Sequence, residues 1–218
     1  MAAEMTADAR RVHDATDLPV TRDRRLAGAL SIALSAAFLL VTMLAASIAP
    51  GYDFHAAAIS DLGVIAETAT LFNVLLIAIG LMNVAAGYLL YRRQHRALLA
   101  IYVLAGIGAT GAGVFPLSTG GLHSLFALAA FVGFNLEVIG SAVLLVGPMR
   151  ALGVLAGAVG LIYAVLMAIG DSGSPAVFGP IGHGGSERMI AYPAVLWLLA
   201  YGGYLTAYSA PQADASRV

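Results

Sequence analysis

The chain has 218 residues, of which 60% are hydrophobic and 11% are charged, and its mean hydropathy is +0.88. This composition excludes a soluble globular protein. The absence of cysteine excludes disulfides, a thiolate nucleophile and cysteine-ligated metal, and the absence of lysine excludes a Schiff-base mechanism. Because a bilayer core of about 30 Å needs about 20 apolar residues per helix, the length accommodates six spans.

We therefore predict an all-α integral membrane protein, a six-helix bundle between two polar tails. Residues 1–25 form the first tail, residues 26–209 form the membrane domain, and residues 210–218 form the second tail. Irregular backbone cannot face lipid, so each apolar run is expected to be helical. The predicted spans are Leu26–Ala49, Thr68–Tyr91, Ala97–Val114, Leu122–Val146, Ala151–Ile169 and Met189–Tyr208.

The charges predict the orientation. Ten of the eleven arginines fall in the tails and in two short turns, at residues 92–96 and 148–150. The other three connections together hold five acidic residues and a single arginine, Arg188. Positive residues collect on the cytoplasmic side, so we expect both termini in the cytoplasm and the acidic loops outside. We expect a multi-pass protein of the cell membrane, with membrane lipids and other membrane proteins as partners and no nucleic acid.

Glycines recur inside the third and fifth spans. Gly153 and Gly157 form a pair of small residues four positions apart, a spacing that favours close approach of membrane helices. We interpret these glycines as packing positions.

The third and fourth spans are joined by an uncharged loop within the sequence GVFPLSTGGLHSLFALAAF, residues 113–131. His123 lies in the first turn of the helix that follows and is the one titratable group there. The two longer loops are predicted to lie at the same membrane face. One carries His55, Ser60 and Asp61, and the other carries Asp171, His183, Glu187 and Arg188.

The segment from Gly170 to Arg188 contains six glycines and two prolines. Such a composition predicts neither a helix nor a strand, and a long irregular loop in a compact domain is typically functional or disordered. Its apolar residues, Val177, Phe178 and Ile181, suggest a loop that folds back as a lid.

These residues favour an acid–base site at the outer face. His123 is the candidate general base or acid, held by Asp61, with Ser60 beside it. Arg188 is expected to bind an anionic head group or a developing oxyanion. The other candidate ligand-binding residues at this face are Glu187, Asn73, Asp171 and His183.

Two other interpretations of the histidines stay open. They could simply hydrogen-bond loop carbonyls and carboxylates. Alternatively, His55, His123 and His183 could bind a metal such as zinc, which commonly takes three protein ligands at catalytic sites. No His-x-x-x-His or His-Glu-x-x-His spacing brings two of them together locally.

Inside the predicted spans the polar residues are few. Glu137 and Asn135 lie near the middle of the fourth span and Asn83 lies on the second. A carboxyl group at this depth normally faces a partner inside the bundle or stays protonated. Glu137 is therefore either a proton or ligand site, or a buried acid that holds helices together.

Four sequence pieces carry a family resemblance: HAAAISDLG at residues 55–63, Phe72-Asn73 with Gly80, GVFPLSTGGLH at residues 113–123, and Ser186–Arg188 leading into Trp197. Together they resemble the domain-of-unknown-function family 998, which consists of six-helix bacterial and archaeal membrane proteins with no assigned activity. The matching motif positions are Ser60, Asp61, Gly63, Asn73, Phe115, Pro116, His123, Glu187 and Arg188. The layout is also distantly similar to the Frag1/DRAM/Sfk1 group, whose members influence membrane lipid distribution.

Three functions follow as hypotheses. The first is binding or modification of a lipid or another amphipathic ligand at the outer face. The second is a small transporter or transport accessory that uses Glu137. The third is a structural subunit of a larger membrane complex, for which the close-packing glycines are the support.

Overall fold

The computed structural model describes residues 22–207, and within them all regular secondary structure is helical. Residues 1–21 and 208–218, which hold most of the first predicted tail and all of the second, lie outside the described residues. Six long helices and three short 3₁₀ helices follow one another in the order α2 (Arg22–Ile48), η1 (Ile59–Gly63), α3 (Ala69–Tyr91), α4 (Arg96–Val114), η2 (Leu117–Thr119), α5 (Gly121–Ala142), α6 (Gly147–Asp171), η3 (Pro175–Ile181) and α7 (Gly182–Thr206).

Six helices in the described part of the chain are long and apolar enough to cross a membrane. The shortest, α4, has 19 residues and is therefore about 28 Å long at about 1.5 Å per residue, which matches the bilayer core. The predicted all-helical bundle of six membrane-length helices is confirmed.

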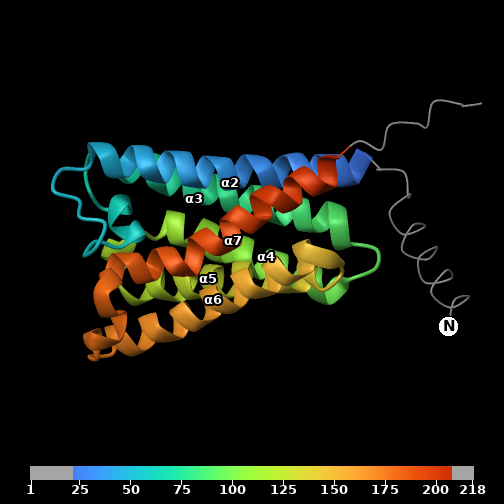
Figure 1. The fold of residues 1–218 in the computed structure, drawn as a ribbon. Helices are drawn as coiled ribbons and strands as arrows, with labels where there is room; N and C mark the ends of the chain where they lie inside the picture. Colours follow the sequence, from blue (N-terminus) through green and yellow to red (C-terminus); the bar gives the residue numbers. More distant parts are fainter. Residues whose placement is uncertain (1–21, 208–218) are drawn as a thin grey trace, which may run out of the picture.

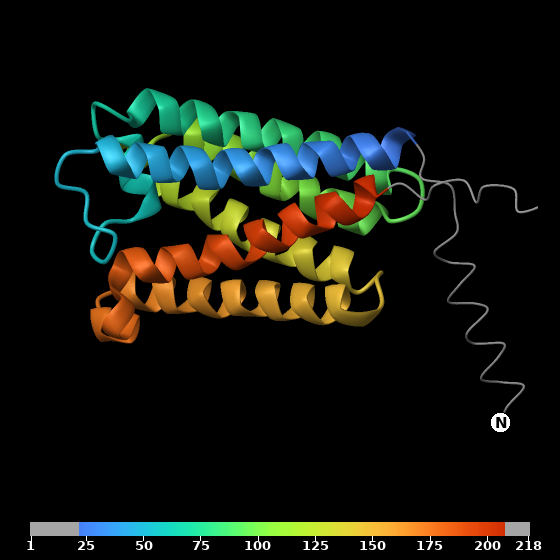
Figure 2. The same cartoon turned by 45° about the horizontal axis from the view of Figure 1, so that its top comes forward.

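The helices form a closed ring in chain order, in which each helix packs on the next and α7 returns to pack on α2. Figures 1 and 2 show the six rods side by side, with every connection at one of two ends. The basic end carries the α3–α4 and α5–α6 turns, together with the start of α2 and the end of α7. The acidic end carries the three longer connections, with η1, η2 and η3.

Small residues set the distances between neighbouring helices. A Cβ added at Gly106 of α4 would lie 2.6 Å from the Gly80 carbonyl oxygen of α3, and one at Gly108 would lie 2.3 Å from the backbone of Ala130 of α5. The same holds at Gly157 of α6, where a Cβ would lie 2.7 Å from the Asn135 carbonyl oxygen. The sequence interpretation of these glycines as packing positions is therefore confirmed.

The start of α7 differs from the prediction. The segment expected to be irregular contains the 3₁₀ helix η3, and α7 begins at Gly182, seven residues before the predicted Met189. The prediction was wrong because two of these glycines are needed for close contact with the α2–α3 connection, and do not make the chain irregular. A Cβ at Gly182 would lie 2.3 Å from the His55 carbonyl oxygen, and one at Gly184 would lie 2.1 Å from that of Ala57.

Helix α2 also begins before the predicted Leu26, at Arg22. Asp23 in its first turn pairs with Arg92 at the end of α3, with the Nη2 and Oδ2 atoms 2.7 Å apart. This ion pair ties α2 to the α3–α4 turn at the basic end. The cytoplasmic location of that end remains a prediction from the arginine distribution.

Candidate functional site

The short helix η1 closes the acidic end of the ring. Ile59 and Leu62 are buried in the core, together with Phe72 of α3. Asp61 stabilises the start of η1, because its Oδ2 accepts a hydrogen bond of 2.8 Å from the Ala58 backbone amide. The predicted catalytic carboxylate therefore has a local structural partner.

Asn73 fixes the other end of this helix. Its Nδ2 donates to the Gly63 carbonyl oxygen over 2.9 Å, and a Cβ at Gly63 would lie 2.6 Å from the Asn73 Oδ1. Glycine at position 63 thus allows α3 and η1 to come together. Asn73 therefore holds the end of η1 against α3.

Glu187 reaches η1 from the first turns of α7. Its side chain is 5% exposed, and Oε2 accepts a hydrogen bond from the Ile59 backbone amide. Its other carboxylate oxygen, Oε1, has no hydrogen-bond partner among the described residues. Oε2 therefore holds η1 in place, and Oε1 remains available to accept a hydrogen bond.

Arg188 points to the α2–α3 connection. Its Nη1 donates to the carbonyl oxygens of Phe54 (3.1 Å), Ala57 (3.2 Å) and Gly184 (2.7 Å), and its Nη2 donates to the Tyr52 hydroxyl over 2.7 Å. The guanidinium also stacks over the Phe54 ring, 4.7 Å from its centroid. Arg188 thus fastens the loop to α7.

Tyr52 is the aromatic partner in this arrangement. Burial raises the pKa of its hydroxyl to about 12, although the adjacent Arg188 guanidinium opposes the rise. The hydroxyl also donates to the Ala58 carbonyl oxygen over 2.8 Å. A neutral phenol at ordinary pH therefore connects Arg188 to the residue that precedes η1.

His123 is buried in the first turn of α5, with 4% of its surface exposed. Its Nδ1 lies 2.8 Å from the Phe115 carbonyl oxygen. A carbonyl only accepts, so Nδ1 is the donor in this contact. Nε2 is then the acceptor of the neutral ring, and it has no hydrogen-bond partner among the described residues.

Two adjoining cavities meet at His123. The inner cavity, of about 90 Å³, is almost wholly apolar and lies within the ring between α2, α3, α4, α5 and α7. The mouth pocket, of about 340 Å³, lies between α5, α6, α7 and η1 at the acidic end. The residues common to both linings are Ser60, His123, Ala127, Phe131, Glu187 and Ile190.

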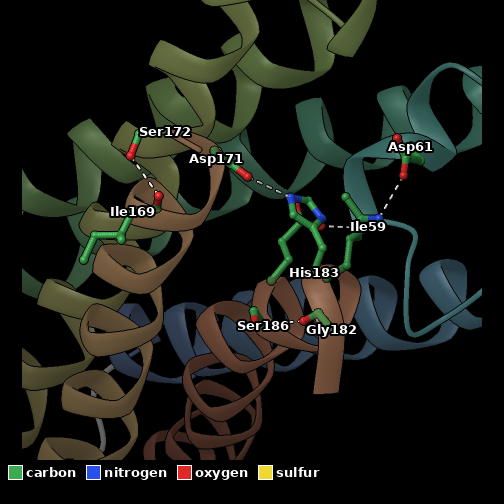
Figure 3. A network of polar contacts seen from close by, with 10 residues as sticks. Ile59, Asp61, Ile169, Asp171, Ser172, Gly182, His183 and Ser186 are labelled. Carbon is green, nitrogen blue, oxygen red and sulfur yellow. Dashed lines mark hydrogen bonds and ion pairs between the residues drawn. The ribbon is translucent and has the colours of Figure 1, made fainter. Parts of the chain in front are cut away.

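Asp171 and His183 both line the mouth pocket and contact each other. Asp171 ends α6 and His183 begins α7, and Figure 3 shows the carboxylate turned toward the imidazole. The distance between Asp171 Oδ1 and His183 Nε2 is 3.1 Å. This contact spans η3, whose buried Phe178 packs edge-on against the His183 ring.

The structure brings most of the predicted site residues together. The predicted residues that line the mouth pocket are Ser60, Asp61, His123, Asp171, His183 and Glu187. The predicted residues outside both linings are His55, Asn73, Glu137 and Arg188. Arg188 was expected to converge with His123 and Asp61, but its hydrogen bonds go to the α2–α3 loop and to Gly184 of its own helix.

The three histidines considered as metal ligands do not gather. His123 and His183 line the mouth pocket, while His55 is exposed on the loop, where its carbonyl oxygen accepts from the Gly184 amide. Among the described residues, no group of three or more histidine, aspartate or glutamate side chains is placed to hold a metal ion. The zinc hypothesis therefore has no coordinating set in residues 22–207.

Glu137 lies away from this site. It is fully buried in α5, and its Oε2 accepts from Asn83 Nδ2 of α3 over 2.8 Å. Two acceptor atoms of this pair, Glu137 Oε1 and Asn83 Oδ1, have no partner in the described residues. A proton on the carboxyl group would supply the donor that they lack. The contact joins α3 to α5 as the structural interpretation of Glu137 expects.

Residues of two kinds were not predicted from the sequence. Ala127, Phe131 and Ile190 connect the cavities but resemble ordinary apolar positions. The other kind is a buried hydroxyl group: Tyr91 and Tyr102 hydrogen-bond to Ser141 over 2.9 and 3.0 Å, and Tyr201 hydrogen-bonds to Tyr91 over 2.9 Å. Tyrosines within apolar spans are the sequence feature from which this group could have been predicted.

The family model described as "Protein of unknown function (DUF998)" matches residues 32–204. The chain belongs to the DUF998 family.

The DUF998 match covers α3 to α6 completely, most of α2 and α7, and every predicted site residue, and it confirms the resemblance carried by the four sequence pieces. Searches of curated proteins and of solved structures gave no match. The distant similarity to the Frag1/DRAM/Sfk1 group remains a prediction.

Proposed function

We propose that this DUF998 protein binds an amphipathic ligand, most simply a membrane lipid, with its aliphatic chain in the inner cavity and its head group in the mouth pocket. The observation that carries the proposal is the junction of the two cavities at His123 and Glu187. An apolar chamber that continues into a polar one matches the division of an amphiphile into chain and head group.

A lateral path to the bilayer supports the same proposal. Gly153, Gly157 and Gly160 hold one half of α6 close to its neighbours. Toward the acidic end, Ala164, Met167 and Ala168 of α6 line the mouth pocket instead. Leu128 of α5 also lines it and is 50% exposed, so the pocket reaches the surface that the bilayer covers. A lipid would enter between α5 and α6.

Modification of the ligand is the finer form of this proposal. The Phe115 carbonyl oxygen orients the His123 ring, and the free Nε2 would take a proton from a ligand hydroxyl or from water. Ser60 lines the same junction and is the candidate nucleophile or second hydrogen-bonding group. His123 would then be the catalytic residue, while Asp61 would act by positioning η1.

The alternative of transport through Glu137 has weaker support. Glu137 is fully buried, outside both cavity linings, and bonded to Asn83. A transport role would require its carboxyl group to meet a water-filled path. Ion flux in proteoliposomes that carry Glu137→Gln measures this directly, and loss of a wild-type flux in the variant would favour transport over ligand binding.

The proposal is tested by native mass spectrometry of the protein purified from membranes in an uncharged detergent. The wild type should retain a bound amphiphile. Ala127→Phe, which places a ring at the junction of the cavities, should lose it. Leu125→Phe lies on the same helix but outside both linings, and it should retain the ligand. A wild type without bound amphiphile, or equal occupancy in Ala127→Phe, would reject the proposal.

Testing the role of His123 requires a variant that removes Nε2 and keeps a donor at the Nδ1 position. His123→Asn keeps an amide donor near the Nδ1 position for the Phe115 carbonyl but removes Nε2, whereas His123→Ala removes both. If Nε2 serves the ligand, His123→Asn should keep the melting temperature and change the composition of the bound ligand. A large fall in melting temperature with unchanged bound lipid in both variants would leave His123 a purely structural residue.

A further inference from the structure

We infer that the head group held in the mouth pocket is a protonated amine, and that anionic phosphate head groups are disfavoured. This inference rests on the proposed binding of an amphiphile and names the chemistry of its polar end. It reverses the sequence expectation of an anionic head group bound by Arg188, and it follows from the direction in which the charged side chains point.

The charged groups that line the pocket are acidic. Asp61 of η1, Asp171 of α6 and Glu187 of α7 contribute three carboxyl groups from three different elements. The other titratable lining residues are His123 and His183, and none of the described lining residues is an arginine. Opposite charges attract and like charges repel across a pocket of this size, so an ammonium group would be attracted where a phosphate would be repelled.

A second observation, separate from the acidic lining, also favours a ligand: two buried side chains at this pocket each have an atom without a hydrogen-bond partner. His123 and Glu187 are each at least nine-tenths buried, and both line the pocket. His123 Nε2 and Glu187 Oε1 have no hydrogen-bond partner among the described residues. Both atoms accept hydrogen bonds when the imidazole is neutral and the carboxylate is ionised. An ammonium group, which carries donors only, would satisfy them.

The nearby cation does not neutralise the pocket by contact. Each Arg188 terminal nitrogen is bonded to the α2–α3 loop or to the Gly184 carbonyl oxygen. Arg188 adjoins Glu187 in sequence, but it is absent from the lining. His183 already faces Asp171 at 3.1 Å, whereas the other two lining carboxylates, Asp61 and Glu187, have no ion pair among the described residues.

The test compares three amphiphiles with one alkyl chain length: a primary amine, the corresponding alcohol and the corresponding monophosphate. Binding to the full-length protein is measured by thermal shift and native mass spectrometry in an uncharged detergent at neutral pH. We expect the amine to bind at least about tenfold more tightly than the phosphate, with the alcohol between them. A short-chain amine with the same head group should not bind, because it leaves the inner cavity empty.

Charge-removing variants then assign the preference to the pocket. Asp171→Asn lies at an exposed helix end and should fold normally. Glu187→Gln keeps an acceptor for the Ile59 amide. Each should reduce the amine-to-phosphate preference several-fold. Glu67→Gln, an exposed loop position outside both linings, is the matched control and should leave the preference unchanged.

The outcomes separate this inference from the proposal on which it depends. Phosphate binding as tight as amine binding, or equal binding of all three amphiphiles, would overturn the amine head group and leave chain binding intact. Binding of the short-chain amine alone would overturn the use of the inner cavity. If none of the amphiphiles binds, both the head-group inference and the proposed function fail.

Discussion

Gly184→Ala tests the contact that positions η1 and the mouth pocket. The added Cβ would lie 2.1 Å from the Ala57 carbonyl oxygen, against 3.4 Å for an ordinary contact. The loop and α7 must therefore separate by up to 1.3 Å (3.4 − 2.1). Overpacking costs about 1–3 kcal/mol, and contact with backbone gives little room to relax. Replacing a helical glycine by alanine returns up to about 1 kcal/mol. We expect a net loss of about 1–2 kcal/mol in the free energy of unfolding.

Gly203→Ala is the matched control in the same helix, because a Cβ there meets no heavy atom within 4 Å. It should raise stability by up to about 1 kcal/mol. Unfolding is followed by far-ultraviolet circular dichroism in one uncharged detergent, for both variants beside the wild type. The reasoning is refuted if Gly184→Ala is as stable as Gly203→Ala. Such a result would mean that the loop does not lie against the start of α7.

Three further predictions concern other parts of the bundle. Arg188→Lys should lower the free energy of unfolding by about 1–3 kcal/mol, because an ammonium group cannot reproduce the contacts to Tyr52 and the loop carbonyls; a melting temperature equal to that of the wild type would contradict this. Glu137→Gln should be as stable as the wild type, whereas Glu137→Ala should lose about 2 kcal/mol or more, because Asn83 Nδ2 would keep only its bond to the Tyr102 carbonyl oxygen; equal melting temperatures for both variants would remove the structural role. Ser174→Cys should be labelled by an impermeant thiol reagent in intact cells, and labelling only after permeabilisation would reverse the predicted orientation.

The sequence was sufficient for the architecture because length, apolar content and the separation of charges constrain a membrane protein strongly. Six runs had to be helices, and the acidic loops had to meet at one end once the helices alternated in direction. His123, Asp61, Asp171, His183 and Glu187 therefore share a pocket, although they come from distant segments.

The direction of individual side chains could not be predicted in the same way. The guanidinium of Arg188 turns to the loop because Gly184 and the carbonyls of residues 54 and 57 form a site for it, and no sequence pattern indicates that contact. Gly182 and Gly184 suggested an irregular loop, but they lie at the start of a helix. These positions are glycine because the neighbouring backbone comes too close for a side chain. The cavities arise from mismatches in packing, which spacing along a chain does not predict.

Photo-crosslinking with an amphiphile tests the central claim most directly. A long-chain primary amine with a photoreactive group at the chain terminus is irradiated with the protein, and the labelled positions are mapped by peptide mass spectrometry. Binding as we propose predicts labels on residues of the inner cavity, such as Ala130, Phe134 and Ala191, and loss of these labels in Ala127→Phe. Labels confined to surface positions outside both linings, such as Leu125, Val165 and Leu196, would contradict the account, because the chain would then lie against the bundle and not within it.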